Sequence, residues 1–277
     1  MSTLRHILTR RAIPAALGVG MLMSILPAGM TFAADRSPAV ERAEWAVLRE
    51  INRVRNNHGL AGVRMAGGVR SVAHARSLSM KRQDYFDHVS PSGVDAGDIL
   101  RARSIPNRYW SEIIGWTVGM ELDRGARWMV DWWKNSPVHR NVMLSARYNY
   151  AGVGIVVDNG HVLWTVDFVN QADHTPPISG LFSAATVNDR GLLSASSTTT
   201  VRWWGRDRRL SVRTAGLDSF TVQHRTGGGR WHTVRSRTTA RQLTMNLRSG
   251  THYFRVKARD NRGNVGRWQG PLRVEVP

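Results

Sequence analysis

Two histidines and one glutamate are the residues of this chain whose types could bind a metal or take part in acid–base chemistry. His88 follows a predicted helix, Glu112 lies in a short apolar stretch, and His139 follows another predicted helix. Two imidazoles and a carboxylate could hold a divalent ion with an open coordination position. The same groups could equally form a histidine–carboxylate hydrogen-bond network, and their spacing matches no compact helical metal motif.

The chain contains no cysteine. Disulfides, thiolate metal ligands and cysteine nucleophiles are therefore excluded. Its 277 residues and 42% hydrophobic content predict two domains with ordinary cores.

The first 34 residues have the pattern of a cleaved signal peptide. Arg5, Arg10 and Arg11 precede an apolar stretch, and the small pair Ala33-Ala34 supplies a cleavage point. We therefore expect a secreted protein, extracellular or associated with the cell envelope, whose mature chain begins near Asp35.

Apolar spacing predicts a mixed α+β region after this signal. Candidate helices cover 38–57, 69–84, 98–103 and 121–135, and His88 and His139 directly follow the second and the last of them. Strands at 151–157 and 161–169 flank the turn Asp158-Asn159-Gly160, which is typical of a β-hairpin. Helices followed by an antiparallel hairpin predict a layered α+β domain over residues 35–172.

Three polar or aromatic residues in this region favour a structural interpretation. Trp128 and Trp132 stand one helical turn apart, and partial burial against a loop is a better expectation than a ligand platform. Asp167 alternates with the apolar residues of its strand, and we expect it to make structural hydrogen bonds.

The pattern changes after residue 172. Residues 173–195 are expected to be a linker that also contributes a first edge strand, and 196–277 show short strands with glycine turns, as in a β-sandwich.

The two regions differ in charge. Residues 35–175 hold 18 Lys and Arg against 15 Asp and Glu, whereas 176–277 hold 18 Lys and Arg against 5 Asp and Glu. A domain with this excess should bind an anionic cell-wall polymer or an acidic lipid surface. Export makes nucleic acid an unlikely partner.

Several motifs resemble the CAP/SCP superfamily of cysteine-rich secretory proteins, antigen 5 and plant pathogenesis-related proteins, in its bacterial form. The matching segments occur in the family's order: Asn52-Arg53-Val54-Arg55, Phe86 to Gly93 with His88, Trp133 to Arg140 with His139, Gly152-Val153-Gly154, and Trp164 to Phe168. The resemblance implies an α-β-α sandwich. In the second region, Thr251 to Asp260 and Gly263 to Trp268 are similar to fibronectin type III-like modules.

The CAP resemblance also implies a ligand cleft. It carries the family's two histidines onto His88 and His139 and its first glutamate onto Glu112, and it puts Ser136 where a second glutamate would stand. His88 and His139 are the expected ligands of a zinc-like divalent ion.

Two functions follow from this cleft. The first is binding of an unidentified small ligand, with the basic β-sandwich docked on an anionic surface. The second is metal-dependent hydrolysis of peptide, ester or cell-wall substrates, with Glu112 as the candidate general base. The absence of an evident nucleophile and of the second acid favours binding.

Overall fold

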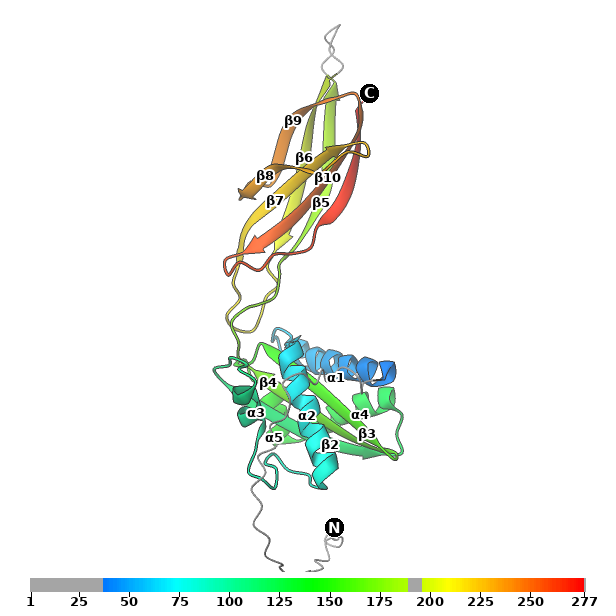
Figure 1. The fold of residues 1–277 in the computed structure, drawn as a ribbon, viewed down its shortest axis with the longest axis vertical. Coiled ribbons are helices and arrows are strands. Elements are labelled where there is room, and N and C mark those ends of the chain that lie inside the picture. The colour runs from blue at the N-terminus through cyan, green and yellow to red at the C-terminus, as the bar shows by residue number, and fades with distance from the viewer. Residues whose placement is uncertain (1–36, 189–195, 277) are drawn as a thin grey trace, which may run out of the picture. The chain divides into compact units, whose positions relative to one another are not determined.

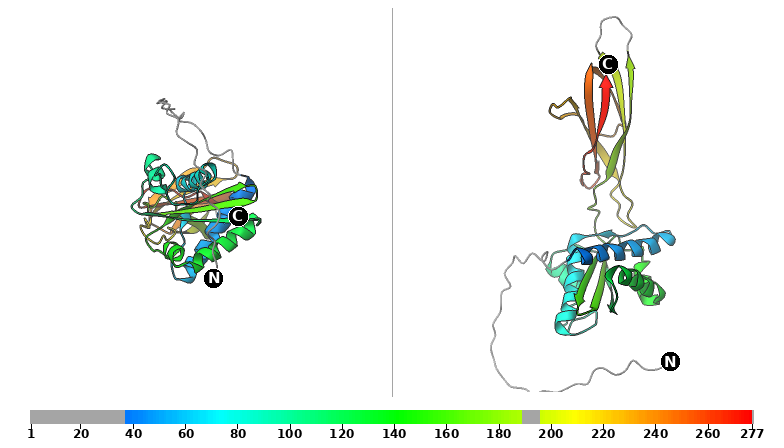
Figure 2. Two further views of the ribbon diagram at one scale, coloured as in Figure 1. Left: turned by 90° about the horizontal axis from the view of Figure 1, so that it is seen from below. Right: turned by 90° about the vertical axis from the view of Figure 1, so that its right-hand side faces the viewer.

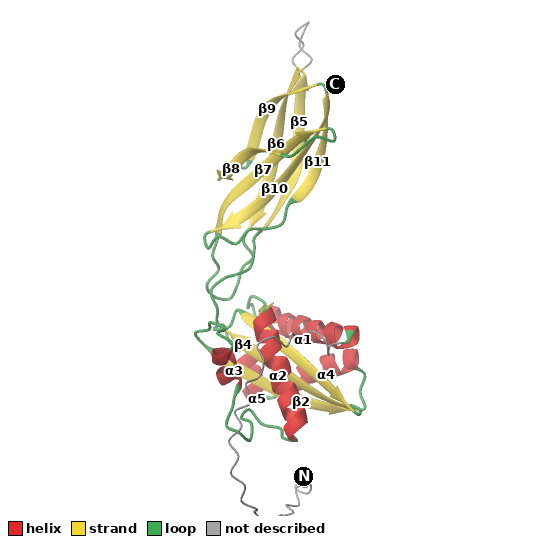
Figure 3. Ribbon diagram, in the orientation of Figure 1, coloured by secondary structure: helices red, strands yellow, loops and turns green. Residues whose placement is uncertain are grey.

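The computed structural model describes residues 37–188 and 196–276. The predicted signal peptide, residues 1–34, lies outside these ranges. None of the helices within them is long and apolar enough to cross a membrane. Residues from Arg36 onward group into one unit, in which a region of helices and strands is followed by a region of strands (Figures 1 and 3).

The first region places helices on both faces of one sheet. Its elements, in chain order, are α1 Pro38–Asn57, β1 Arg64–Met65, α2 Gly67–Gln83, α3 Ala96–Ala102, β2 Trp110–Val118, α4 Leu122–Asn135, α5 Pro137–Met143, β3 Tyr150–Asp158 and β4 His161–Val169. The strand order is β1-β3-β4-β2, with β1 parallel to β3 and the other neighbours antiparallel. One buried cluster joins α1 and α4 to the sheet, and another joins α2 and α3 to its other face (Figure 2). The predicted α-β-α arrangement is confirmed.

Local sequence explains where the main elements begin and turn. The Ser37 hydroxyl accepts a hydrogen bond from the Val40 amide, and Pro38 occupies the first position of α1, where no amide donor is needed. Between β3 and β4, Asn159 and Gly160 have φ values of 47° and 83°. Two positive φ values are what a type I′ turn requires, and this turn sets the register of the hairpin.

Two elements next to the site were not predicted from the sequence. β2 carries Glu112 at the edge of the sheet, and four of its central residues are buried in succession, so no polar–apolar alternation marks it as a strand. α5 begins directly after α4 at Pro137 and is only seven residues long. His139 therefore lies within a helix, not in a loop after one.

The second region consists of two facing sheets of antiparallel strands. Its strands are β5 Ile178–Asn188, β6 Ser196–Arg206, β7 Leu217–Thr226, β8 His232–Thr238, β9 Gln242–Arg248, β10 Gly250–Asp260 and β11 Gln269–Val276. One sheet has the order β11-β10-β7-β8 and the other β5-β6-β9. Residues from both, including Trp203, Phe220 and Val256, form a shared core. This is the expected all-β sandwich.

The boundary between the regions differs from a simple linker. β5 occupies much of the range 173–195 and pairs with β6 as an edge strand. The segment between β6 and β7 packs back on the first region: Leu210 is buried with Val69 and Tyr150. Arg55 of α1 also contacts this segment: its guanidinium donates to the Ser211 hydroxyl, and to the Met143 carbonyl within the first region. Burial at this position lowers the pKa of Arg55 to about 10.

Candidate functional site

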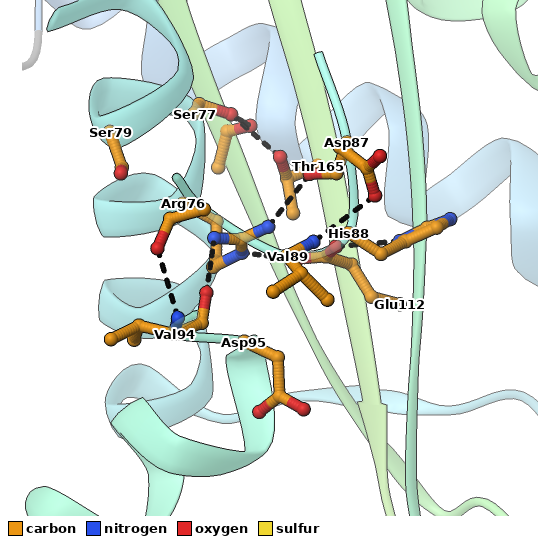
Figure 4. Close-up of polar contacts among 12 residues, drawn as sticks. Arg76, Ser77, Ser79, Asp87, His88, Val89, Val94, Asp95, Glu112 and Thr165 are labelled. Atoms are coloured by element: carbon orange, nitrogen blue, oxygen red, sulfur yellow. Dashed lines mark hydrogen bonds and ion pairs between the residues drawn. The ribbon is translucent and has the colours of Figure 1, made fainter. Parts of the chain in front are cut away.

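Glu112 is the buried centre of the site. Its side chain is 2% exposed, and each carboxylate oxygen has a charged or titratable partner. Arg76 Nε donates to Oε1 at 2.8 Å, and His88 Nδ1 lies 2.8 Å from Oε2 (Figure 4). The structure therefore realises the histidine–carboxylate network that was one of the two alternatives for these residues.

Arg76 also holds the loop that carries His88. It projects from α2 with no exposed surface, and besides Glu112 it donates to the Tyr85 hydroxyl and to the carbonyls of Asp87 and Val94. A guanidinium has five donors in a fixed plane, which suits it to bridge one carboxylate and several carbonyls. In the sequence Arg76 only interrupts an apolar pattern. A basic residue on the buried face of a helix is itself a signal, because such a charge needs a partner.

His139 lies on α5, and its Nδ1 is 2.8 Å from the Ser136 hydroxyl. Its ring stacks at a tilt on Trp132, with 5.1 Å between ring centres. Burial, and then the neighbouring His88, lower the pKa of His139. The hydrogen bond to Glu112 raises the pKa of His88. Both histidines and Ser136 thus contribute to one region.

A metal held by all three expected side chains does not fit this geometry. Among the described residues, only the ligand atoms of Asp173, Asp207 and Asp260 lie within 4.8 Å of one another as a group of three. Those of His88, Glu112 and His139 do not. Glu112 already uses both oxygens. Each imidazole has an oxygen beside its Nδ1, Glu112 Oε2 for His88 and the Ser136 hydroxyl for His139. Because a carboxylate accepts, the Nδ1 of His88 is the donor, which leaves its Nε2 as the acceptor.

Asp167 lies behind Glu112 and differs from its expected role. It pairs with Glu112 across β2 and β4 and is fully buried. Neither carboxyl oxygen has a hydrogen-bond partner among the described residues, so the expected structural hydrogen bonds are absent there. Burial, and then the negative charge of Glu112, raise the pKa of Asp167 well above its ordinary value.

We predict that Asp167→Asn increases stability at pH 8. An acid with a raised folded pKa favours the folded state while protonated, and this advantage is lost as the pH rises from about 3.9 through the folded pKa. Asparagine cannot ionise, so the variant should be more stable than wild type at pH 8, and the difference should shrink at pH 4. Urea unfolding at both pH values measures it, with exposed Asp131→Asn as the control. A variant less stable at pH 8 would contradict the prediction.

An aromatic groove adjoins the histidines. It has a volume of about 370 Å³ and lies between β2, α4 and the His88 loop, lined among others by Phe86, Trp116, Trp128, Met129 and Trp132. Trp132 therefore contacts both the groove and His139.

Trp128 and Trp132 were expected to be partly buried against a loop, and they line this groove together with Phe86 of the His88 loop. Their exposed fractions are 45% and 46%. The signal was present in the sequence: Ala126, Met129, Val130 and Trp133 already form the apolar face of α4, so tryptophans on its other faces cannot reach the core.

Comparison with known proteins agrees with the resemblance in the first region. A family model described as "CAP: Cysteine-rich secretory protein family" matches residues 48–168. "Uncharacterized protein YkwD" of Bacillus subtilis is 28% identical over 136 residues, which are 48% of this chain and 49% of the relative. "Uncharacterized membrane protein YlbC" of the same organism is 31% identical over 113 residues, which are 41% of this chain and 31% of the relative.

One solved structure to which this chain is similar has the following match. It is an extracellular protein containing an SCP domain from Bacillus anthracis, 24% identical, with a TM-score of 0.40, and the match covers 47% of this chain and 41% of that one. The chain spans at most about half the length of the curated relatives that it matches.

Proposed function

We propose that this chain, in which residues 48–168 form a CAP domain of the cysteine-rich secretory protein family, is an exported protein that binds a small ligand at the His88–His139 site. The basic residues of 196–277 would dock it on an anionic surface of the cell envelope. The observation that carries the binding role is the state of Glu112, whose two oxygens are both engaged in a buried network.

Glu112 is poorly placed to act as a general base. A base must accept a proton from water or substrate within hydrogen-bond reach. Here one oxygen is held by Arg76, the other faces His88, and the side chain is almost wholly buried. Its role in this proposal is to orient the His88 ring, which is itself half-exposed.

The surroundings indicate what kind of ligand would fit. His88 and His139 offer polar contacts, while the groove beside them is lined mainly by aromatic and apolar side chains. Ligand sites of this type bind the apolar body of a small molecule and fix it through a few polar groups. A ligand with a flat or apolar part and an acidic or metal-binding end suits both features.

The proposal includes a weak divalent metal site at the two histidines. The Nε2 atoms of His88 and His139 would hold a zinc-like ion, which would polarise a ligand oxygen bound beside it. Glu112 and Ser136 would keep the two rings oriented from the Nδ1 side.

Zinc titration of the whole protein by calorimetry tests this site. We expect His88→Gln and His139→Gln each to abolish measurable binding, and Glu112→Gln to weaken it by about 10- to 100-fold, because loss of an outer hydrogen-bond partner has effects of that size. His161→Gln, on an exposed strand end, serves as the matched control.

Two results would contradict the proposal. Zinc affinity unchanged in both histidine variants would remove the metal site. A metal-dependent hydrolysis of peptide or ester substrates that Glu112→Gln abolishes would replace ligand binding by catalysis.

A further inference from the structure

Cations and aromatic rings alternate in a column on the outer face of the β-sandwich. Along β7 and β10, the side chains of Arg225, Tyr253, Arg255 and Lys257 belong to the alternate positions that point away from the core. Trp231, just before β8, and Trp268, just before β11, insert between them. We call these six residues the cation–aromatic column.

Every neighbouring pair in the column is in stacking range. The Arg225 guanidinium lies 4.9 Å from the Tyr253 ring centre and 4.8 Å from that of Trp231. Arg255 lies 4.3 Å from Trp231 and 4.5 Å from Trp268, and the Lys257 ammonium is 4.7 Å from Trp268. The order is therefore Tyr253, Arg225, Trp231, Arg255, Trp268, Lys257.

The three cations of the column have no acidic partner. Among the residues that the structure describes, no ion pair involves Arg225, Arg255 or Lys257, and Arg255 instead donates twice to the Gln223 amide oxygen. Arg225 Nε has no hydrogen-bond acceptor in the described part of the chain. The outer face of this sheet does hold one carboxylate, Glu275, and it is paired with Arg273. Positive charge is thus collected in the column and left uncompensated.

Stacking prepares these cations to bind anions. A ring against the flat face of a guanidinium restrains the side chain and leaves its N–H edge available for oxygen acceptors. Arg255 and Lys257 are alternate residues of β10, which are about 6.8 Å apart along a strand. Arg225 is opposite Tyr253 on β7 and therefore diagonal to Arg255, at a Cα separation of about 7–8 Å, so the three cations form a row. Burial, and then repulsion from Arg225, lower the pKa of Arg255, and a bound anion would offset that repulsion.

We infer that the cation–aromatic column is the binding track for a linear phosphodiester polymer of the cell envelope. This rests on the docking role proposed above and assigns it to one face of one sheet. A linear polymer fits better than a membrane surface because the large rings are flanked by cations and only partly exposed, so they are not free to insert into lipid. A track of three cations suits successive charges along a chain.

The test measures binding of the whole protein to soluble poly(glycerol phosphate) by calorimetry at low salt. The test variant carries Arg225→Gln, Arg255→Gln and Lys257→Gln. The control carries Arg202→Gln, Arg206→Gln and Arg248→Gln, which remove the same charge from exposed positions on β6 and β9. We expect the column variant to lose at least 10-fold in affinity and the control less than about 3-fold. The slope of log K against log salt concentration should become less negative by about two for the column variant. Each contact with a single charged strand contributes roughly 0.7 to this slope, and the variant removes three cations.

A second variant keeps the charge and removes the planar groups. Arg225→Lys with Arg255→Lys should weaken binding by about 3- to 10-fold, because an ammonium cannot stack or bridge oxygens as a guanidinium does. Thermal unfolding of each variant shows that the fold is retained.

Each other outcome overturns a distinct claim. Equal losses in the column and control variants would mean that net charge alone binds the polymer, so the column would be wrong and the docking role would stand. Failure of the wild-type protein to bind the polymer would overturn the docking role itself. Tighter binding to phosphatidylglycerol vesicles than to the polymer at equal phosphate would make the partner a lipid surface.

Discussion

Replacing Arg76 by methionine is expected to destabilise the protein by about 3–5 kcal/mol. Methionine fills a similar volume but leaves Glu112 without its cationic partner in a site where both side chains are almost completely buried. Removing one partner of a buried pair costs this much because the remaining charge stays desolvated and uncompensated. Equilibrium urea unfolding at pH 7 gives the difference.

The matched control is Arg53→Met. Arg53 pairs with Glu50 one turn away on α1, with 64% of its own side chain exposed. Exposed pairs contribute little, so we expect a change below about 0.5 kcal/mol. Similar losses in the two variants would show that Arg76 acts through its apolar stem and not through its charge.

The Arg76 substitution should also disturb the His88 loop. Arg76 bonds the carbonyls of Asp87 and Val94, which lie on either side of the histidine's turn. Without it, the orientation of His88 toward Glu112 depends on a single hydrogen bond. Zinc affinity measured on the folded variant should therefore fall as well. Arg76→Lys keeps the charge but not the planar set of donors, so it should restore the stability of the protein more fully than the zinc affinity.

Much of the first region could be predicted from the sequence because its main elements are defined by local patterns. The long helices follow from apolar residues at helical spacing, and the β3–β4 hairpin follows from its turn residues. β2 could not be predicted in this way, because its buried run has no alternation. What makes it a strand is its pairing with β4, which lies about 50 residues later in the chain.

The candidate site shows the same division. The motif resemblance named His88, Glu112 and His139 as candidates, but it did not say what Glu112 contacts. That depends on Arg76 reaching it from α2, a meeting of two elements 36 residues apart. The cation–aromatic column is a similar case. The sequence shows that Arg255 and Lys257 occupy alternate positions of one strand. It does not show that Trp231 and Trp268, from two other segments of the chain, stack against these cations.

Replacing Gly154 by alanine is expected to destabilise the protein by about 3 kcal/mol or more. β3 lies directly against α2 at this glycine: an added Cβ would sit 2.1 Å from the His74 nitrogen and 2.2 Å from the Ala73 carbonyl carbon. These are backbone atoms, so no side-chain rotation can relieve the clash, and the helix must move away from the sheet. Overpacking a core ordinarily costs about 1–3 kcal/mol, and a backbone clash belongs at or beyond the upper end.

Two other glycines provide a graded control for this substitution. Gly115→Ala would meet chiefly the mobile end of the Met129 side chain, so we expect a smaller loss, and Gly67→Ala, in open space at the start of α2, should be close to neutral. Because α2 also carries Arg76, displacing it should separate Arg76 from Glu112 and weaken zinc binding at His88 in the fraction that still folds. Urea unfolding and zinc calorimetry on the three variants measure both effects. A Gly154→Ala protein as stable as Gly67→Ala would mean that α2 does not rest on β3 as closely as these distances require.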